Sequence, residues 1–134
     1  MPIHWDILHD QRLVTVRAEG QLTLPEMEKY LDALITGDAM PYAKLFDVSG
    51  LDASYSDHDM LMLGARIRAY VPLVKGGPLA FVAVNKAQRD AVDHYLGLAA
   101  VEHRPAAVFA TVEKARAWLE EQSRMGGAST ADRR

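Results

Sequence analysis

The chain has no cysteine among its 134 residues. It therefore forms neither a disulfide nor a thiolate metal site, and it suits a reducing compartment. No apolar run approaches the roughly 18 residues that span a bilayer, and the N-terminus lacks the basic and apolar segments of a signal peptide. These absences predict a cytoplasmic protein with no membrane insertion.

The chain also lacks an excess of positive charge. It carries 15 lysines and arginines against 18 aspartates and glutamates, and its formal net charge is -3. Because attraction to nucleic acid or anionic lipid starts from clustered lysine and arginine, we expect neither as a partner. A chain of this length fits one domain that buries about two thirds of its unfolded surface.

Apolar and polar side chains alternate in residues 3–8 and again in residues 13–18, which predicts a two-stranded hairpin. A Thr-x-x-Glu capping box then starts a helix near Leu24, and Gly37 ends it. The inward stripe of this helix is expected to contain Leu24, Met27, Leu31, Leu34 and Ile35.

Leu45 and Phe46 lie in a short run, residues 43–48, that has no clean alternation of apolar and polar side chains, as expected of an interior strand that is covered on both faces. We expect this strand to break at a turn formed by Ser49 and Gly50. A second helix is then predicted from Ser56, a residue type that caps helices, to a stop at Pro72. Ligands and partners of α/β sheets bind beyond the carboxyl ends of the strands, so the candidate site lies here.

The second half of the chain repeats strand and helix. Residues 79–84 form the most continuous apolar run and predict another central strand. Asn85 caps a helix whose inward stripe is expected to be Ala87, Ala91, Tyr95 and Leu98. Residues 106–109 are a short last strand, followed by a helix that packs through Val112, Ala115, Trp118 and Leu119.

The resulting order of elements is β-β-α-β-α-β-α-β-α. It predicts an α/β fold with a five-stranded mixed sheet, in which an N-terminal hairpin precedes the β-α crossovers and helices pack on the sheet. Residues 1–122 are expected to form this single domain. Residues 123–134 bury almost nothing apolar and predict a disordered C-terminal tail.

This order resembles the STAS-like family when it is combined with two segments of sequence. The first is the strand Leu45-Phe46-Asp47-Val48-Ser49-Gly50-Leu51, and the second leads from Val108 into an Ala-x-x-Trp-Leu helix at residues 115–119. The family has the SpoIIAA-like fold of bacterial anti-sigma-factor antagonists and is related to CRAL-TRIO domains. The likeness covers nearly all of residues 3–122 and implies a regulatory, protein-binding role.

In the antagonists, a serine at the start of the helix after this strand is phosphorylated to switch partner binding. The resemblance places this candidate phosphoacceptor at Ser56. The rest of the antagonists' Asp-Ser-Ser-Gly run is replaced by Tyr55, Asp57 and His58. Because Asp57 and Asp59 repel a phosphate at the helix start, a simple N-cap role for Ser56 is the alternative.

The candidate binding residues surround the end of the central strand: Asp47, Ser49, Gly50, Tyr55, Ser56, Asp57 and His58. Asp47 is alternatively a structural acceptor for backbone N–H groups of the following segment. His58 and its acidic neighbours point in different directions around a helix, which favours a solvated helix start over a metal site. A further group lines either an adaptable apolar pocket or plain core: Tyr55, Met60, Met62 and Tyr70.

These residues leave three hypotheses for the function. The first is a non-enzymatic STAS-like binding or regulatory module that presents residues 47–62 to a protein partner or, as a homodimer, to a second copy. The second is a carrier of a small apolar or lipid-like ligand. The third is an enzyme that uses Asp47 and His58. The chain has no Gly-x-Ser-x-Gly motif and no phosphate-loop spacing, which favours the first hypothesis and predicts no cofactor.

Overall fold

The computed structural model describes residues 3–21, 23–39, 41–52, 58, 61–62, 65, 77–99 and 105–132. Its strands are β1 (Ile3–Leu8), β2 (Leu13–Gly20), β3 (Ala43–Leu51), β4 (Leu79–Val82) and β5 (Ala106–Phe109). Its helices are α1 (Leu24–Thr36), α3 (Lys86–Ala99), α4 (Val112–Asp132) and the short 3-10 helix η1 (His9–Gln11) between β1 and β2. The helix predicted to begin at Ser56 lies almost wholly outside the described residues.

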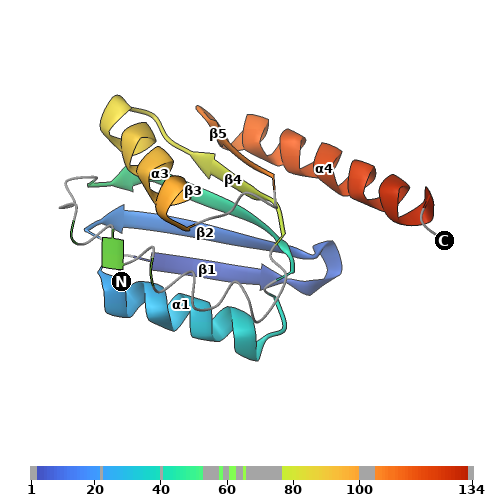
Figure 1. Cartoon of the computed structure of the whole chain (residues 1–134), viewed down its shortest axis with the longest axis horizontal. Helices are drawn as coiled ribbons and strands as arrows, with labels where there is room; N and C mark the ends of the chain where they lie inside the picture. Colours follow the sequence, from blue (N-terminus) through green and yellow to red (C-terminus); the bar gives the residue numbers. More distant parts are fainter. Residues whose placement is uncertain are drawn as a thin grey trace.

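The five strands form one sheet in the order β1-β2-β3-β4-β5 (Figure 1). β1 and β2 are antiparallel, whereas β2, β3, β4 and β5 run parallel to one another. This arrangement confirms the predicted α/β fold with a mixed sheet and an N-terminal hairpin. The carboxyl ends of the parallel strands lie at the same edge of the sheet, which we call the carboxyl edge.

Helices pack on both faces of the sheet, α1 and α3 on one and α4 on the other. Each face has its own core because successive side chains of a strand point to opposite faces. The core under α1 and α3 includes the buried strand residues Val14, Val16, Phe46 and Phe81. The core under α4 includes Leu13, Leu45, Ala80 and Val82, packed against Ala115 and Leu119.

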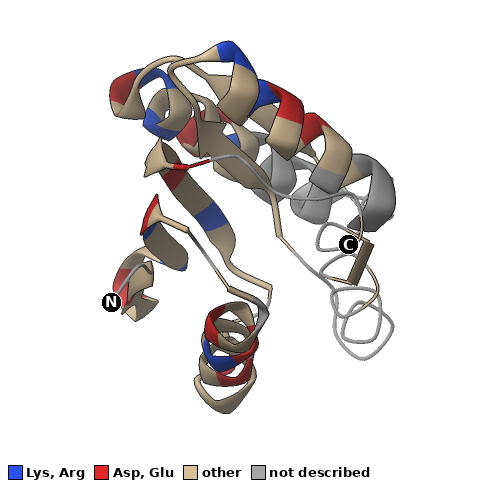
Figure 2. Cartoon of the chain, turned by 90° about the vertical axis from the view of Figure 1, so that its left-hand side faces the viewer, with Lys and Arg blue, Asp and Glu red and all other residues tan. Residues whose placement is uncertain are grey.

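α1 begins at the predicted capping box. The Glu26 carboxylate oxygen Oε1 accepts the Thr23 backbone N–H at 3.3 Å and the Thr23 hydroxyl at 2.6 Å. This pairing fixes the first turn, where backbone groups have no partner within the helix. Farther along α1, acidic and basic residues are interspersed (Figure 2), as is typical of a solvated helix face.

The buried stripe of α1 differs from the predicted one at two positions. Met27, Leu31 and Leu34 are buried as predicted, but Ile35 is 39% exposed and Tyr30 is only 2% exposed. The Tyr30 ring packs edge-on against Trp5 and Phe46, with ring centroids 5.7 and 5.4 Å apart. The predicted stripe of α1 does not include Tyr30 because of its hydroxyl group, although a tyrosine ring buries a large area when it meets other rings. The side chain of Leu24 lies outside the described residues.

The inward stripe of α3 also differs from the predicted one. Gln88 and Val92 are 3% and 5% exposed, whereas Ala87 is exposed and Ala91 is half-buried. The prediction was wrong because alanine fits either face of a helix, so alanines do not fix the rotation of the helix about its axis. Of the predicted stripe, the side chains of Tyr95 and Leu98 lie outside the described residues.

β3 continues past the point at which the sequence predicts a Ser-Gly turn. Its pairing with β2 passes from Arg17 opposite Asp47 to Glu19 opposite Gly50, so β3 holds one extra residue at a β-bulge. The predicted break was wrong because the bulge absorbs the irregularity and the pairing with β2 resumes beyond it. The strand therefore ends at Leu51.

α4 packs on the sheet through the predicted stripe, with Ala115 and Leu119 buried and Val112 and Trp118 half-buried. The helix continues to Asp132, whereas the composition predicts a disordered tail from residue 123. Figure 1 shows the far half of α4 running past the sheet. Helix elongation adds one local hydrogen bond per residue, so a low apolar content does not by itself end a helix. The domain boundary at residue 122 stays a prediction.

Candidate functional site

Asp47 lies on β3 at the carboxyl edge, and its side chain fixes the backbone that follows. Its carboxylate oxygen Oδ1 accepts the Ser49 backbone N–H at 3.0 Å and the Ser49 hydroxyl at 2.6 Å. This geometry matches the structural interpretation of Asp47, in which the carboxylate holds the next residues in place. Residues 49–52, which we call the β3 exit, therefore follow a defined path.

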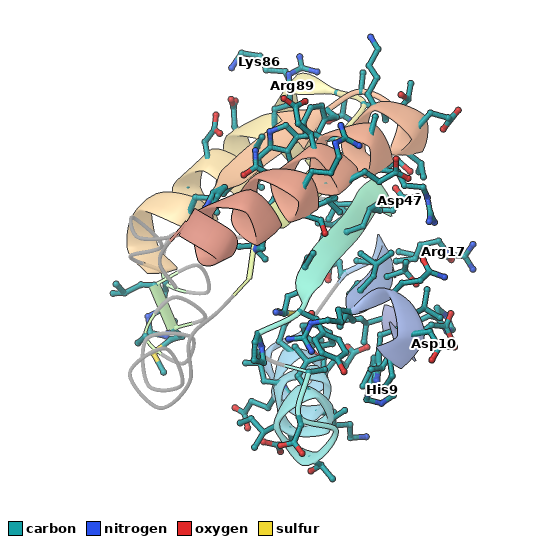
Figure 3. The ribbon with its side chains drawn as sticks, turned by 90° about the vertical axis from the view of Figure 1, so that its right-hand side faces the viewer. His9, Asp10, Arg17, Asp47, Lys86 and Arg89 are labelled. Atoms are coloured by element: carbon teal, nitrogen blue, oxygen red, sulfur yellow. The ribbon has the colours of Figure 1, made fainter. Side chains whose placement is uncertain are left out.

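Arg17 lies opposite Asp47 on the neighbouring strand β2, and the two lie side by side in Figure 3. The Arg17 guanidinium Nε forms an ion pair with Glu19 Oε1 at 2.9 Å. The side chains of this pair are 62% and 51% exposed, so solvent screens the attraction and the pair adds little stability. Exposed charges of both signs thus border Asp47.

Gly50 allows the β3 exit to lie close to β2. A Cβ atom at this position would lie 3.3 Å from Glu19 Cγ and 3.6 Å from the Ala18 backbone oxygen. A larger side chain would therefore press on β2 at the bulge. Gly50 itself is exposed, so its backbone is accessible from solvent.

Gln88 connects the β3 exit to α3 and to the segment after β4. Its side-chain nitrogen Nε2 donates hydrogen bonds to the backbone oxygens of Ser49 and Leu51, at 2.9 and 3.1 Å. Its side-chain oxygen Oε1 accepts the Val84 N–H at 2.9 Å. One buried carboxamide therefore satisfies three backbone groups from two segments that are distant in sequence.

The first turn of α3 begins beside this contact. Asn85 Oδ1 accepts the Gln88 backbone N–H at 2.8 Å, which confirms the predicted cap. Lys86 Nζ donates to Asp90 Oδ2 at 2.7 Å in an exposed pair, and Arg89 is also exposed. Figure 3 shows Lys86 and Arg89 near each other on this helix. The first turns of α3, which follow β4 at the carboxyl edge, thus carry exposed basic side chains.

Val84 gives the carboxyl edge an exposed apolar side chain. It is 56% exposed, although its backbone N–H is bonded to Gln88. Leu61 and Met62, which follow the β3 exit in sequence, are 54% and 44% exposed. The fourth large apolar residue that is exposed in the described part of the chain is Ile35, on α1.

Most of the predicted residues beyond β3 lie outside the described residues. These are Tyr55, Ser56, Asp57, Met60 and Tyr70. The candidate phosphoacceptor and the apolar pocket therefore stay predictions. His58 is described and is exposed, as is Met62. Within the described ranges, no group of three or more histidines and acids could hold a metal ion, and no helix is both long and apolar enough to cross a membrane.

The sequence interpretation missed Gln88 and Val84. Gln88 stands one turn before Val92 on the same face of α3, so a polar residue in phase with the core was the available signal. Val84 was assigned to the strand that ends at Val82 in the structure. The exposure of Val84 depends on where β4 ends. The apolar run continues to Val84, so it does not indicate that the strand ends at Val82.

A second group of polar and aromatic side chains lies at the opposite edge, where β2 and β3 begin. His9 Nδ1 lies 2.8 Å from the Tyr42 hydroxyl oxygen, and the Arg12 guanidinium lies 4.9 Å from the centre of the Tyr42 ring. The buried Lys44 ammonium donates to the Tyr42 backbone oxygen at 2.7 Å. These contacts hold the link between β1 and β2 against the start of β3. In Figure 3, His9 lies well away from Asp47.

Neither a family model nor a curated protein matches the chain. Among solved structures, the chain is similar to an uncharacterized protein of the DUF3478 family with a SpoIIAA-like fold, from Shewanella loihica PV-4. The TM-score is 0.56 and the sequence identity is 20%, and the match covers 87% of this chain and 91% of that chain. The chain thus has the SpoIIAA-like fold that the sequence resemblance predicted. At this identity, the likeness shows the fold alone.

Proposed function

We propose that the chain is a non-enzymatic binding module of regulatory function, whose protein partner docks on the carboxyl edge around residues 47–62. The observation that carries the proposal is the pre-organised backbone of the β3 exit. Asp47 holds it from within β3 and Gln88 holds it from α3. A surface that is already fixed loses little conformational entropy on binding, so more of the contact energy appears as affinity.

The exposed side chains of this edge suit a protein partner. Val84 is apolar and exposed, and Lys86 and Arg89 are charged and exposed on the next turn. Leu61 and Met62 add apolar surface within the proposed segment. An apolar centre with a polar rim is the usual composition of a protein interface.

The state of Asp47 favours binding over catalysis. A catalytic carboxylate must reach the proton that it transfers. Asp47 Oδ1 already accepts two hydrogen bonds from Ser49, one at 2.6 Å. Its geometry is that of a structural residue. The enzyme hypothesis, with Asp47 and His58, is therefore the less favoured one.

The alternative role as a carrier of an apolar ligand rests on residues that lie mostly outside the described part of the chain. Native mass spectrometry of freshly purified protein tests it directly through the presence of a bound mass. The phosphorylation of Ser56 rests on the family resemblance, and mass spectrometry of protein from its native cells tests it as well. The proposed docking surface at Val84 depends neither on a bound apolar ligand nor on phosphorylation of Ser56.

An affinity capture experiment with a matched control tests the proposal. Val84→Asp places a charge on the apolar part of the carboxyl edge, and Ile35→Asp makes the same change on α1. We expect wild type and Ile35→Asp to capture the same partner from native cell extract after chemical crosslinking, and Val84→Asp to lose it. Capture of an unchanged set of proteins by a folded Val84→Asp variant would contradict the proposed docking surface.

A further inference from the structure

We infer that Gln88 joins the β3 exit and the first turn of α3 into one mechanical unit, so that a displacement of either segment is transmitted to the other. The biological use of this coupling rests on the proposed function, because the β3 exit leads into the proposed docking segment. The coupling itself is a property of the free protein.

The coupling acts where the sheet no longer connects the two segments. The pairing between β3 and β4 ends with Asp47 opposite Val82. Ser49 and Leu51 on one side, and Val84 on the other, lie beyond that last pair. The Gln88 carboxamide forms hydrogen bonds with the backbones of all three residues. These bonds connect the two segments where β3 and β4 are no longer paired.

The orientation of the carboxamide follows from its partners. The two backbone oxygens of Ser49 and Leu51 require a donor, and the Val84 N–H requires an acceptor. Reversing the amide would place its oxygen against two oxygens and its nitrogen against an N–H. Because Gln88 is only 3% exposed, water does not readily replace these bonds.

Gln88 also belongs to the cap of α3, which extends the unit into the helix. Its own backbone N–H donates to Asn85 Oδ1 at 2.8 Å, and the next N–H, that of Arg89, donates to the Asn85 backbone oxygen at 3.1 Å. The same residue thus has its side chain on the β3 exit and its backbone in the first turn. A movement of the β3 exit is therefore transmitted to the first turn of α3, which carries Lys86 and Arg89.

Amide hydrogen exchange in the full chain tests the inference. Three reporters are used: the Val84 amide, bonded to Gln88; the Asp52 amide, bonded to the Gly20 oxygen at 2.7 Å; and the Arg89 amide, bonded to Asn85. In Gln88→Met, which keeps the size and removes the carboxamide, we expect all three to exchange about tenfold faster relative to the amides of β2. The control Gln122→Met makes the same change in a half-buried position of α4 and should leave all three unchanged.

A second variant separates the two halves of the carboxamide. Gln88→Glu keeps the acceptor for Val84 and removes the donors, so at neutral pH the Asp52 amide should exchange faster while the Val84 amide is less affected. If only the Val84 amide responds in Gln88→Met, or if Asp52 is unchanged in both variants, Gln88 makes a local bond and the inference is wrong. These exchange measurements need no partner. They can therefore contradict the coupling without contradicting the docking surface at Val84, and the capture experiment can contradict the docking surface without contradicting the coupling.

Discussion

At the scale of single residues, two polar side chains organise the carboxyl edge. Asp47 and Gln88 both use their hydrogen-bonding capacity on backbone groups. A side chain used in this way stabilises a path of the chain and does not by itself perform chemistry. Val84 and Arg89 are exposed near Gln88 in sequence, and we propose that they contact the partner.

Replacing Asp47 measures how much its carboxylate contributes to the fold. Asp47→Ala removes the acceptor for both bonds from Ser49, and we expect a loss of about 2 kcal/mol in the free energy of unfolding. Asp47→Asn keeps an oxygen acceptor and should lose less than about 1 kcal/mol. Urea titrations of the two variants and wild type give these differences. Equal stability of Asp47→Ala and wild type would show that these hydrogen bonds do not hold the β3 exit.

Replacing Gln88 by glutamate makes the stability dependent on pH. A buried carboxylate that faces the oxygens of Ser49 and Leu51 is disfavoured as an anion, so the pKa of the carboxyl group introduced by Gln88→Glu should rise above its ordinary value. A raised pKa in the folded state means that the relative stability of this variant is highest in acid and is lost as the pH rises through that pKa.

The check is the difference in unfolding free energy between Gln88→Glu and wild type, followed from about pH 4 to about pH 7. We expect this difference to grow with pH. Gln122→Glu on α4, whose side chain is half-buried, should show a smaller change. Parallel curves for Gln88→Glu and wild type would indicate that position 88 is open to water.

At the scale of elements, the strands and α4 were predictable because their signals are local. Alternation of apolar and polar residues gave the β1 and β2 hairpin, and the spacing of Ala115 and Leu119 gave the face of α4 that packs on the sheet. The end of β3 was not predictable, because the bulge exists only through pairing with β2. The face of α3 was missed for a similar reason, since a buried Gln88 is acceptable only when distant backbone groups bond to it.

The packed and projecting parts of α4 should contribute very differently to stability. Removing residues 123–134 leaves the buried Ala115 and Leu119 in place, so we expect a change within about 0.5 kcal/mol. Leu119→Ala opens a cavity in the core under α4 and should cost about 2 to 5 kcal/mol. Thermal and urea unfolding of both variants make the comparison. A large loss on truncation would move the domain boundary beyond residue 122.

At the scale of the whole molecule, the SpoIIAA-like architecture was predictable from the order of elements and from two short segments of sequence. The docking surface proposed above rests on the sequence only for its place, the carboxyl edge of the sheet. Asp47, Ser49 and Gly50 were identified from the strand that contains them. Gln88 comes from a helix 37 to 39 residues away, and only the folded chain brings it to the β3 exit.

The central claim is that a protein partner docks on the carboxyl edge beside the β3 exit. Photocrosslinking from a benzophenone amino acid in place of Val84, compared with the same group in place of Ile35, tests it most directly in native cell extract. We predict a discrete adduct, with one other protein or with a second copy of the chain, from position 84 and not from position 35. No adduct from position 84, or the same adducts from both positions, would contradict it.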